Sequence, residues 1–167
     1  MGGGPEASQK LLILLSEPEP KDIITSLRKK HPDLTIEYHS TKDGSKLSTD
    51  IYKDADYLFT WGNVPENPNS DAPKLKWVHF YSAGINQVVD KPIWTDAPEV
   101  VLTTSSGVHG PQIAEWVVMT LLGAQHFYTD LHDLQKEHKS GGNELYRKLG
   151  ESRDSVGQRI GFWDMAR

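Results

Sequence analysis

The chain has 167 residues, a formal charge of −5, no cysteine and 37% hydrophobic residues. That length gives room for one good core, or for one domain and part of another. The acidic balance argues against a general nucleic-acid or membrane-surface binder, and the lack of cysteine excludes disulfides, thiolate metal sites and a cysteine nucleophile. The longest apolar run near the start, LLILL at 11–15, is too short for a signal-peptide core or a membrane span, so we expect a cytoplasmic protein.

The first hundred residues alternate between short apolar runs and polar or helical stretches. Residues 1–9 are small and polar and are predicted to form a disordered tail. The run KLLILLS is apolar without alternation, which is typical of a parallel strand that is buried on both faces. The helix predicted over DIITSLRKK has its Ile and Leu residues on one face. The strands predicted in this way are 10–16, 34–38, 56–60, 75–81 and 100–104.

This alternation at short spacing predicts an α/β fold with a flavodoxin-like, doubly wound parallel sheet over residues 10–104. The stretch 47–52 is expected to form an amphipathic turn. Residues 63–73, rich in Pro, Asn and Ser, are expected to form an exposed loop. A short helix is predicted over 85–89.

A long helix is predicted over 111–138. Pro111 can occupy its first turn, where the missing N–H costs nothing. The residues that follow, from Ile113 to Ala124, are apolar nearly all round, and a helix of that kind is buried on every side. It therefore needs more neighbours than one sheet face provides, which means a second domain, a partner subunit or both.

The segment GVHGPQIAEW, after a strand and a loop of small residues, resembles the interdomain helix of the D-isomer-specific 2-hydroxyacid dehydrogenases. The likeness extends upstream through LKWVHFYSAGIN to about Leu11 and downstream to Gly161. It implies an oxidoreductase that interconverts 2-keto and D-2-hydroxy acids with NAD or NADP. It also implies a substrate domain over 10–104. Residues 105–167 would hold the interdomain helix, which makes a homodimer through 111–138, and the first strand, 156–163, of an incomplete Rossmann domain.

Two loops are candidates for the substrate site, because ligands of open parallel sheets bind beyond the carboxyl ends of the strands. Ser82, Ala83 and Gly84 follow one strand, and their small size lets free backbone N–H groups approach a carboxylate. They could instead make only a tight turn. Trp61 and Gly62 end the third strand and are similar to the second substrate-facing loop of the family, with an aromatic plug at the sheet edge as the alternative. The resemblance assigns all five residues to a small 2-keto or 2-hydroxy acid.

Two residues at the start of the long helix are candidates for the cofactor site. The resemblance places His109 and Gln112 near the nicotinamide end of NAD or NADP, and helix capping with hinge packing is the alternative role. The histidines show no spacing suited to a metal, so no metal site is predicted. Asp50, Asp54 and Asp56 suggest the acidic phosphate-acceptor pocket of a response regulator, but they precede a strand rather than follow one.

This sequence lacks the residues that hydride transfer requires. A nicotinamide enzyme of this kind needs a G-x-G-x-x-G turn for the pyrophosphate, a histidine acid/base and an arginine for the substrate carboxylate. The family carries its Arg, Glu and His after the glycine-rich loop, and no histidine follows His138 here. No catalytic residue is therefore predicted, and the chain is expected to be inactive alone and not to bind the cofactor.

The last residues, GFWDMAR at 161–167, fit a shifted reading frame of a family-like run G-I-L-G-Y-G-S-I-G. Deletion of one base from a possible coding of that run gives these seven residues and a stop. The chain would then be a truncated dehydrogenase, through a frameshift, a misplaced intron boundary or a true isoform; an unrelated tail is the alternative. Two other functions stay open, a non-catalytic module that dimerises or binds a ligand, and a flavodoxin-like receiver domain.

Overall fold

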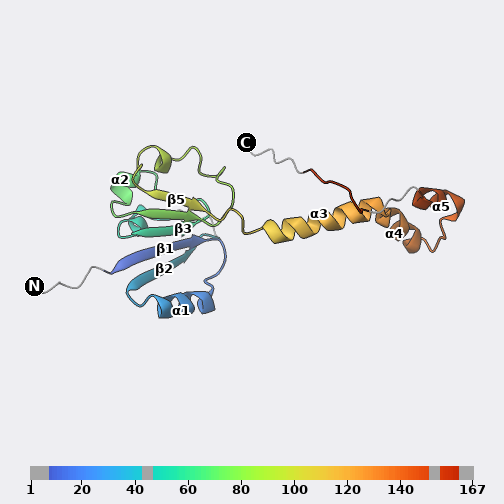
Figure 1. Cartoon of the computed structure of the whole chain (residues 1–167). Helices are drawn as coiled ribbons and strands as arrows, with labels where there is room; N and C mark the ends of the chain where they lie inside the picture. The colour runs from blue at the N-terminus through green and yellow to red at the C-terminus, as the bar shows by residue number, and fades with distance from the viewer. Residues whose placement is uncertain (1–7, 43–46, 151–154, 162–167) are drawn as a thin grey trace, which may run out of the picture. The chain divides into compact units, whose positions relative to one another are not determined.

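The computed structural model describes residues 8–42, 47–150 and 155–161 (Figure 1). The chain divides into two compact units, Met1–Val108 and His109–Arg167. Most of the predicted tail lies outside the described residues, but Gln9 already belongs to the first strand and the Ser8 hydroxyl donates to the carbonyl of Asp33 (3.0 Å). No helix in the described part of the chain is long and apolar enough to cross a membrane.

The first unit is built on a five-stranded sheet in the order β2-β1-β3-β4-β5, in which every neighbouring pair is parallel. This order is that of flavodoxin-like folds and confirms the predicted fold class. All five predicted strands are present, with ends shifted by at most two residues. They are β1 (Gln9–Leu15), β2 (Leu34–Ser40), β3 (Tyr57–Thr60), β4 (Trp77–Phe80) and β5 (Val101–Thr104).

The central strand β1 explains why its sequence is apolar without alternation. Leu12 and Leu14 are fully buried in one cluster, and Ile13 is buried in another on the opposite face of the sheet. Helix α1 (Lys21–Lys30) covers the Ile13 face, where its Ile24 is buried (Figure 1). The other face packs against three short elements, η1 (Thr49–Tyr52), α2 (Pro68–Asp71) and η2 (Pro92–Trp94).

The connection after β4 differs from the prediction, because residues 85–89 form turns and not a helix. Val88 N–H donates to the Ile85 carbonyl (2.9 Å), and Lys91 N–H donates to the Val88 carbonyl (3.0 Å). The Val88 side chain is fully buried, and its carbonyl also accepts the indole N–H of Trp94 (2.7 Å). The two backbone bonds are those of successive turns, and the burial of Val88 and the bond from Trp94 hold this irregular backbone in place. The predicted loop 63–73 also differs, since it contains the short helix α2.

The second unit consists of helices α3 (Gly110–Gln125), α4 (Tyr128–Lys136) and α5 (Gly142–Gly150). The prediction of one continuous helix over 111–138 is therefore wrong. Phe127 has a φ of 52°, in the left-handed region that no right-handed helix can continue through. Its N–H donates to the Ala124 carbonyl (3.3 Å) and its own carbonyl accepts from Leu131 N–H (3.0 Å), so one helix ends and the next begins at this residue.

Helix α5 lies where a polar linker was expected. Gly141, with a φ of +61°, joins it to α4, and a side chain at this glycine would come within 2.8 Å of the Leu134 Cδ1 atom. The strand predicted over 156–163 is absent from residues 155–161, which form turns, while residues 162 and 163 lie outside the described residues. Ser155 and Gln158 each hydrogen-bond the Gln125 side chain at the end of α3 (2.6 Å). Since a strand exists only by pairing, a segment with no strand beside it among the described residues of its unit stays irregular.

Candidate functional site

Two loops follow neighbouring strands at the carboxyl edge of the sheet. Trp61 and Gly62 come directly after β3, and Ser82, Ala83 and Gly84 come two residues after β4 ends. Because β3 and β4 pair in parallel, both loops leave the sheet at the same edge. The structure therefore brings together the five residues that were predicted to bind substrate.

The loop after β3 is fixed from inside the sheet by Thr60. This side chain is fully buried, and its Oγ1 atom accepts the backbone N–H of Asn63 (3.1 Å). The Thr60 carbonyl accepts the N–H of Tyr81 (3.1 Å) and so extends the pairing of the two strands to the edge of the loops. Trp61 itself is half exposed, with 51% of its surface accessible, so it does not act as a buried plug.

A side chain that was not predicted, Gln87, joins the two loops. Its Nε2 atom donates to the carbonyl of Trp61 (2.6 Å) and to the Ser82 hydroxyl (2.9 Å). A carbonyl oxygen only accepts hydrogen bonds, so the amide atom that faces Trp61 must be the nitrogen. The Ser82 hydroxyl in turn donates to the carbonyl of Gly84 (2.7 Å). One chain of hydrogen bonds therefore runs from Trp61 through Gln87 and Ser82 to Gly84.

The backbone of the second loop offers donors to a ligand. Ala83 and Gly84 are exposed, and the described residues provide no hydrogen-bond acceptor for the N–H group of either. A side chain at Gly84 would meet no atom within 4 Å, so there is open space beside it. Two unused N–H groups next to open space at the end of a parallel strand suit an anionic oxygen ligand.

A hollow of about 660 Å³ lies beside the first loop. Trp61, Gly62 and Asn63 form part of its wall, together with one basic residue, Lys91, and one acidic residue, Glu66. Tyr52 also lines it, and burial, with a smaller effect from Asp71, raises the pKa of this phenol to about 12. The Tyr52 hydroxyl therefore stays protonated throughout the neutral range and can act there as a hydrogen-bond donor.

The two predicted cofactor contacts lie together in the second unit. His109 and Gln112 line a shallow hollow of about 370 Å³ with Ile113 and Trp116, at the start of α3. His109 is the residue that precedes the helix, and its side chain makes no capping hydrogen bond. The imidazole of His109 therefore does not cap the helix.

Solved structures of known enzymes match this fold. A D-isomer-specific 2-hydroxyacid dehydrogenase family protein of Aeromonas salmonicida matches 79% of the chain with a TM-score of 0.59 and 22% identity. D-mandelate dehydrogenase of Rhodotorula graminis matches 88% with a TM-score of 0.59 and 16% identity. D-lactate dehydrogenase of Aquifex aeolicus, solved with NAD and lactic acid, matches 83% with a TM-score of 0.53 and 16% identity.

The chain matches part of the fold of these 2-hydroxyacid dehydrogenases. The match covers 40% of the Aeromonas protein and 46% of each of the other two, so the chain spans less than half the length of these structures. Neither family models nor curated proteins match the sequence. The resemblance seen in GVHGPQIAEW and SAGIN is thus confirmed as a likeness of fold.

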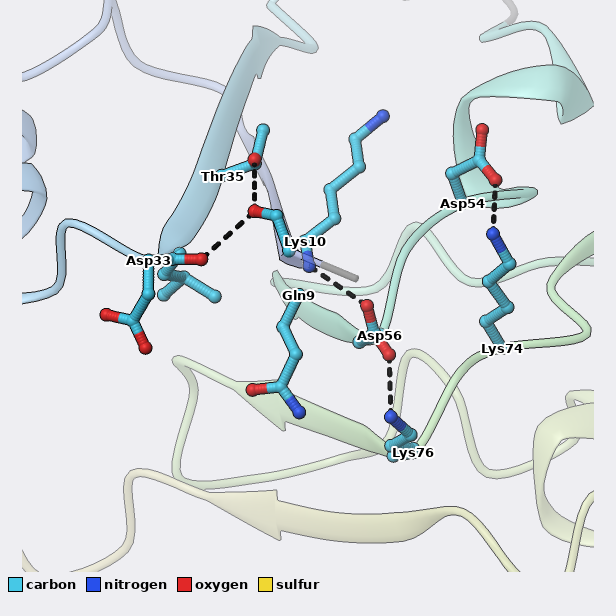
Figure 2. Close-up of a pocket in the computed structure, with 10 residues that line it drawn as sticks. Gln9, Lys10, Asp33, Thr35, Asp54, Asp56, Lys74 and Lys76 are labelled. Atoms are coloured by element: carbon cyan, nitrogen blue, oxygen red, sulfur yellow. Dashed lines mark hydrogen bonds and ion pairs between the residues drawn. The ribbon is translucent and has the colours of Figure 1, made fainter. Parts of the chain in front are cut away.

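The acidic residues near β3 do not form the pocket of a receiver domain. They lie at the amino edge of the sheet, before β3 and β4 begin, where they line a hollow of about 570 Å³. Figure 2 shows Asp54 and Asp56 beside the lysines that contact them. Asp54 pairs with Lys74 (2.7 Å), while Asp56 accepts the backbone N–H of Lys10 (2.9 Å) and the ammonium group of Lys76 (2.7 Å). Each carboxylate is therefore engaged with a lysine. Among the described residues, no group of three His, Cys, Asp or Glu side chains could hold a metal.

Gln87 carries only a weak signal in the sequence. It stands between Ile85 and Val88, two apolar residues of the segment that was predicted as a short helix. A polar side chain there is ordinarily taken for the solvent face of a helix. Its role appears only when the Trp61 and Ser82 loops are known to be neighbours, which is a property of the strand order.

Proposed function

We propose that the chain binds the carboxylate of a small 2-keto or 2-hydroxy acid between the Trp61–Gly62 loop and the Ser82–Gly84 loop. The observation that carries this proposal is the pair of exposed residues Ala83 and Gly84 at the carboxyl edge of the sheet, whose N–H groups have no acceptor among the described residues. The fold shared with D-lactate and D-mandelate dehydrogenases supports the choice of ligand class. The residues of this chain would bind and orient the acid.

The proposed chemistry is that of charge-assisted hydrogen bonds. Each carboxylate oxygen accepts one N–H group, and such bonds are about twice as strong as neutral ones. Lys91, in the wall of the neighbouring hollow, adds a positive charge on the same side as Trp61 and Gly62. The half-exposed indole of Trp61 provides an apolar surface for the rest of a small acid.

The test is a titration of the chain with pyruvate, followed by the amide resonances of Ala83 and Gly84. Both should shift with a single dissociation constant, while ethyl pyruvate, which lacks the carboxylate, should leave them unmoved. Gly84→Pro removes one donor and should weaken binding by on the order of tenfold. Gly84→Ala is the matched control, since it keeps the N–H group and its side chain meets no atom within 4 Å.

Two results would contradict the proposal. One is an absence of shifts with pyruvate, glyoxylate and hydroxypyruvate at high concentration. The other is a shift of equal size with the ester, because binding would then not depend on the carboxylate. Circular dichroism of each variant separates lost binding from lost folding.

A cofactor fits the described residues less well than the acid does. His109 and Gln112 stay candidates for contact with the nicotinamide end of NAD or NADP, but their hollow is lined by two polar and two apolar side chains at the start of one helix. That set offers no cradle for a pyrophosphate, and the sequence contains no G-x-G-x-x-G. We therefore propose no step of hydride transfer for this chain. The domain limits 10–104 and 105–167 and the cytoplasmic location likewise stay predictions.

A second candidate function is that of a module that dimerises through α3 and α4, the predicted 111–138 interface. The specific observation is the exposure of apolar residues on α3: Ile113, Trp116 and Met119 each have about 60% of their surface accessible. Val118 and Leu122 are also exposed. Exposed apolar residues that gather on one helix usually mark an association site.

A further inference from the structure

We propose that Gln87 is a positioning residue that holds the Trp61–Gly62 loop against the Ser82–Gly84 loop and thereby sets the affinity of the chain for a carboxylate. The inference rests on the proposed function for its ligand. Its structural part, the coupling of the two loops, rests on the hydrogen bonds of Gln87 alone.

The side chain of Gln87 reaches both loops. Trp61 and Gln87 are 26 positions apart in the sequence, yet the Gln87 amide nitrogen is 2.6 Å from the Trp61 carbonyl oxygen. The same nitrogen is 2.9 Å from the Ser82 hydroxyl, which lies in the other loop. Both N–H groups of one amide are thus used, one for each loop.

The backbone that carries Gln87 is itself anchored. Its neighbour Val88 is fully buried in the core, and the Val88 carbonyl accepts from both Lys91 N–H (3.0 Å) and the Trp94 indole (2.7 Å). The backbone that carries Gln87 is therefore held by the core of the sheet. A side chain that extends from a fixed backbone to two loops restrains both of them.

The position of the Gln87 side chain explains the glycine at position 62. A Cβ atom there would lie 2.8 Å from the Cγ atom of Gln87 and 3.5 Å from a methyl group of Val88. Because Val88 is held by the core, the Gln87 side chain is the group that would have to move. The lack of a side chain at Gly62 thus makes the space through which Gln87 reaches Trp61.

The consequence concerns the donors of the substrate loop. The Ser82 hydroxyl accepts from Gln87 and donates to the Gly84 carbonyl, so Gln87 restrains the Ser82 side chain and the peptide group that follows Gly84. The peptide groups that carry the two N–H donors are held from the segment after β5, because the Ser82 carbonyl accepts from Ser105 N–H (3.1 Å) and the Ala83 carbonyl accepts from the Ser106 hydroxyl (3.3 Å). Gln87 therefore sets the position of the Trp61–Gly62 loop relative to these donors. Without this link Gln87 no longer holds the Trp61–Gly62 loop against the Ser82–Gly84 loop, so a ligand must bring the two loops together as it binds, and that cost appears as lost affinity. Loss of two hydrogen bonds predicts binding weaker by on the order of tenfold.

The experiment compares four variants of the full chain by amide NMR, first without ligand and then with pyruvate. Gln87→Met keeps the length of the side chain and removes both donors. Gly62→Ala should displace Gln87 and have the same effect, and the double variant should be no weaker in binding than either single one, since the two changes break one link. Asn86→Ala, at the exposed neighbouring position, is the control and should behave as the wild type.

Without ligand, Gln87→Met and Gly62→Ala should broaden or shift the amide signals of Trp61, Ala83 and Gly84 and leave those of β1 unmoved. With pyruvate, both should bind about tenfold more weakly than the wild type. A purely structural role would lower the melting temperature and move signals across the sheet. It would also give additive losses in the double variant.

The outcomes separate this inference from the proposed function. If the wild-type chain binds no 2-keto acid, the proposed function and the affinity part of the inference both fail, and the ligand-free spectra decide whether Gln87 couples the loops. If the wild type binds and Gln87→Met binds equally well, the inference alone is overturned. Unchanged loop signals in ligand-free Gln87→Met overturn the coupling in either case.

Discussion

Single residues at the two edges of the sheet have different roles, since those at one edge position groups for a ligand and those at the other connect strands. At the carboxyl edge, Thr60 and Gln87 use hydrogen bonds to place backbone groups that a ligand can reach. At the amino edge, Asp56 uses its bonds to tie β1 to the segment before β4. Burial alone would raise the pKa of Asp56, but the hydrogen bonds from Lys76 and from the Lys10 backbone outweigh it and hold the pKa below its ordinary value.

Asp56→Asn is expected to lower the free energy of unfolding by about 1.5–3 kcal/mol at neutral pH, the range for hydrogen bonds to a charged group. A carboxyl with a lowered pKa in the folded state contributes stability above its unfolded pKa of about 4 and loses it as the pH falls through the folded value. The gap between wild type and variant should therefore close in acid. Denaturant unfolding at several pH values measures it.

Asp54→Asn is the control for this experiment. Asp54 is also paired with a lysine, but its side chain is 70% exposed, and exposed ion pairs add little stability. Its free energy of unfolding should stay near that of the wild type at every pH. Equal effects of the two changes would show that burial of Asp56 does not matter.

At the scale of the elements, the sequence predicted what depends on composition and missed what depends on single backbone angles. The strands were found because runs such as LLILL are apolar on both faces, and the helix α1 because Ile24 and Leu27 share a side. The break between α3 and α4 was missed, since it consists of one residue, Phe127, in a left-handed conformation. Helix α5 was missed because a run of polar residues resembled a linker.

Gly141→Ala should loosen the packing of α5 against α4. The new side chain would be strained at a φ of +61°, would come within 2.8 Å of Leu134 in α4 and would come closer still to Leu145 in α5. Gly142→Ala has a comparable backbone cost, at a φ of +54°, but would meet no atom within 4 Å. Hydrogen exchange of the α5 amides measures both variants, and equally fast exchange in the two would mean that the contacts of this side chain with Leu134 and Leu145 have no weight.

The exposed apolar surface of α3 predicts self-association. Val118→Asp and Leu122→Lys should shift the purified chain toward monomer, because each places a charge on that surface. Sedimentation velocity over a range of concentrations measures the distribution. Ile23→Asp, an exposed apolar position on α1, serves as the control and should not change it. A wild-type chain that stays monomeric at high concentration would contradict this prediction.

At the scale of the whole molecule, the chain shares a fold with enzymes of which it spans less than half. The parallel sheet and the two loops at its carboxyl edge were predictable, because short β-α-β spacing predicts parallel strands whose carboxyl ends lie at one edge. The link through Gln87 was not, since it depends on which loops become neighbours in three dimensions.

The purified chain is expected to oxidise no NADH with glyoxylate, pyruvate or hydroxypyruvate. Its sequence contains no G-x-G-x-x-G and no histidine after His138. The absorbance of NADH at high protein concentration measures this, with a blank without protein. Turnover that is well above the blank and is abolished by a change at Ser82 or Gly84 would contradict the prediction.

The strand order has a consequence for synthesis on the ribosome. In the order β2-β1-β3-β4-β5, each strand from β2 onward is added at an edge of the strands that precede it in the chain. Every newly made strand therefore meets a partner that has already left the ribosome, and none has to be inserted between two others. The sheet can grow outward from β1 in the same direction as translation, with β5 closing the far edge last.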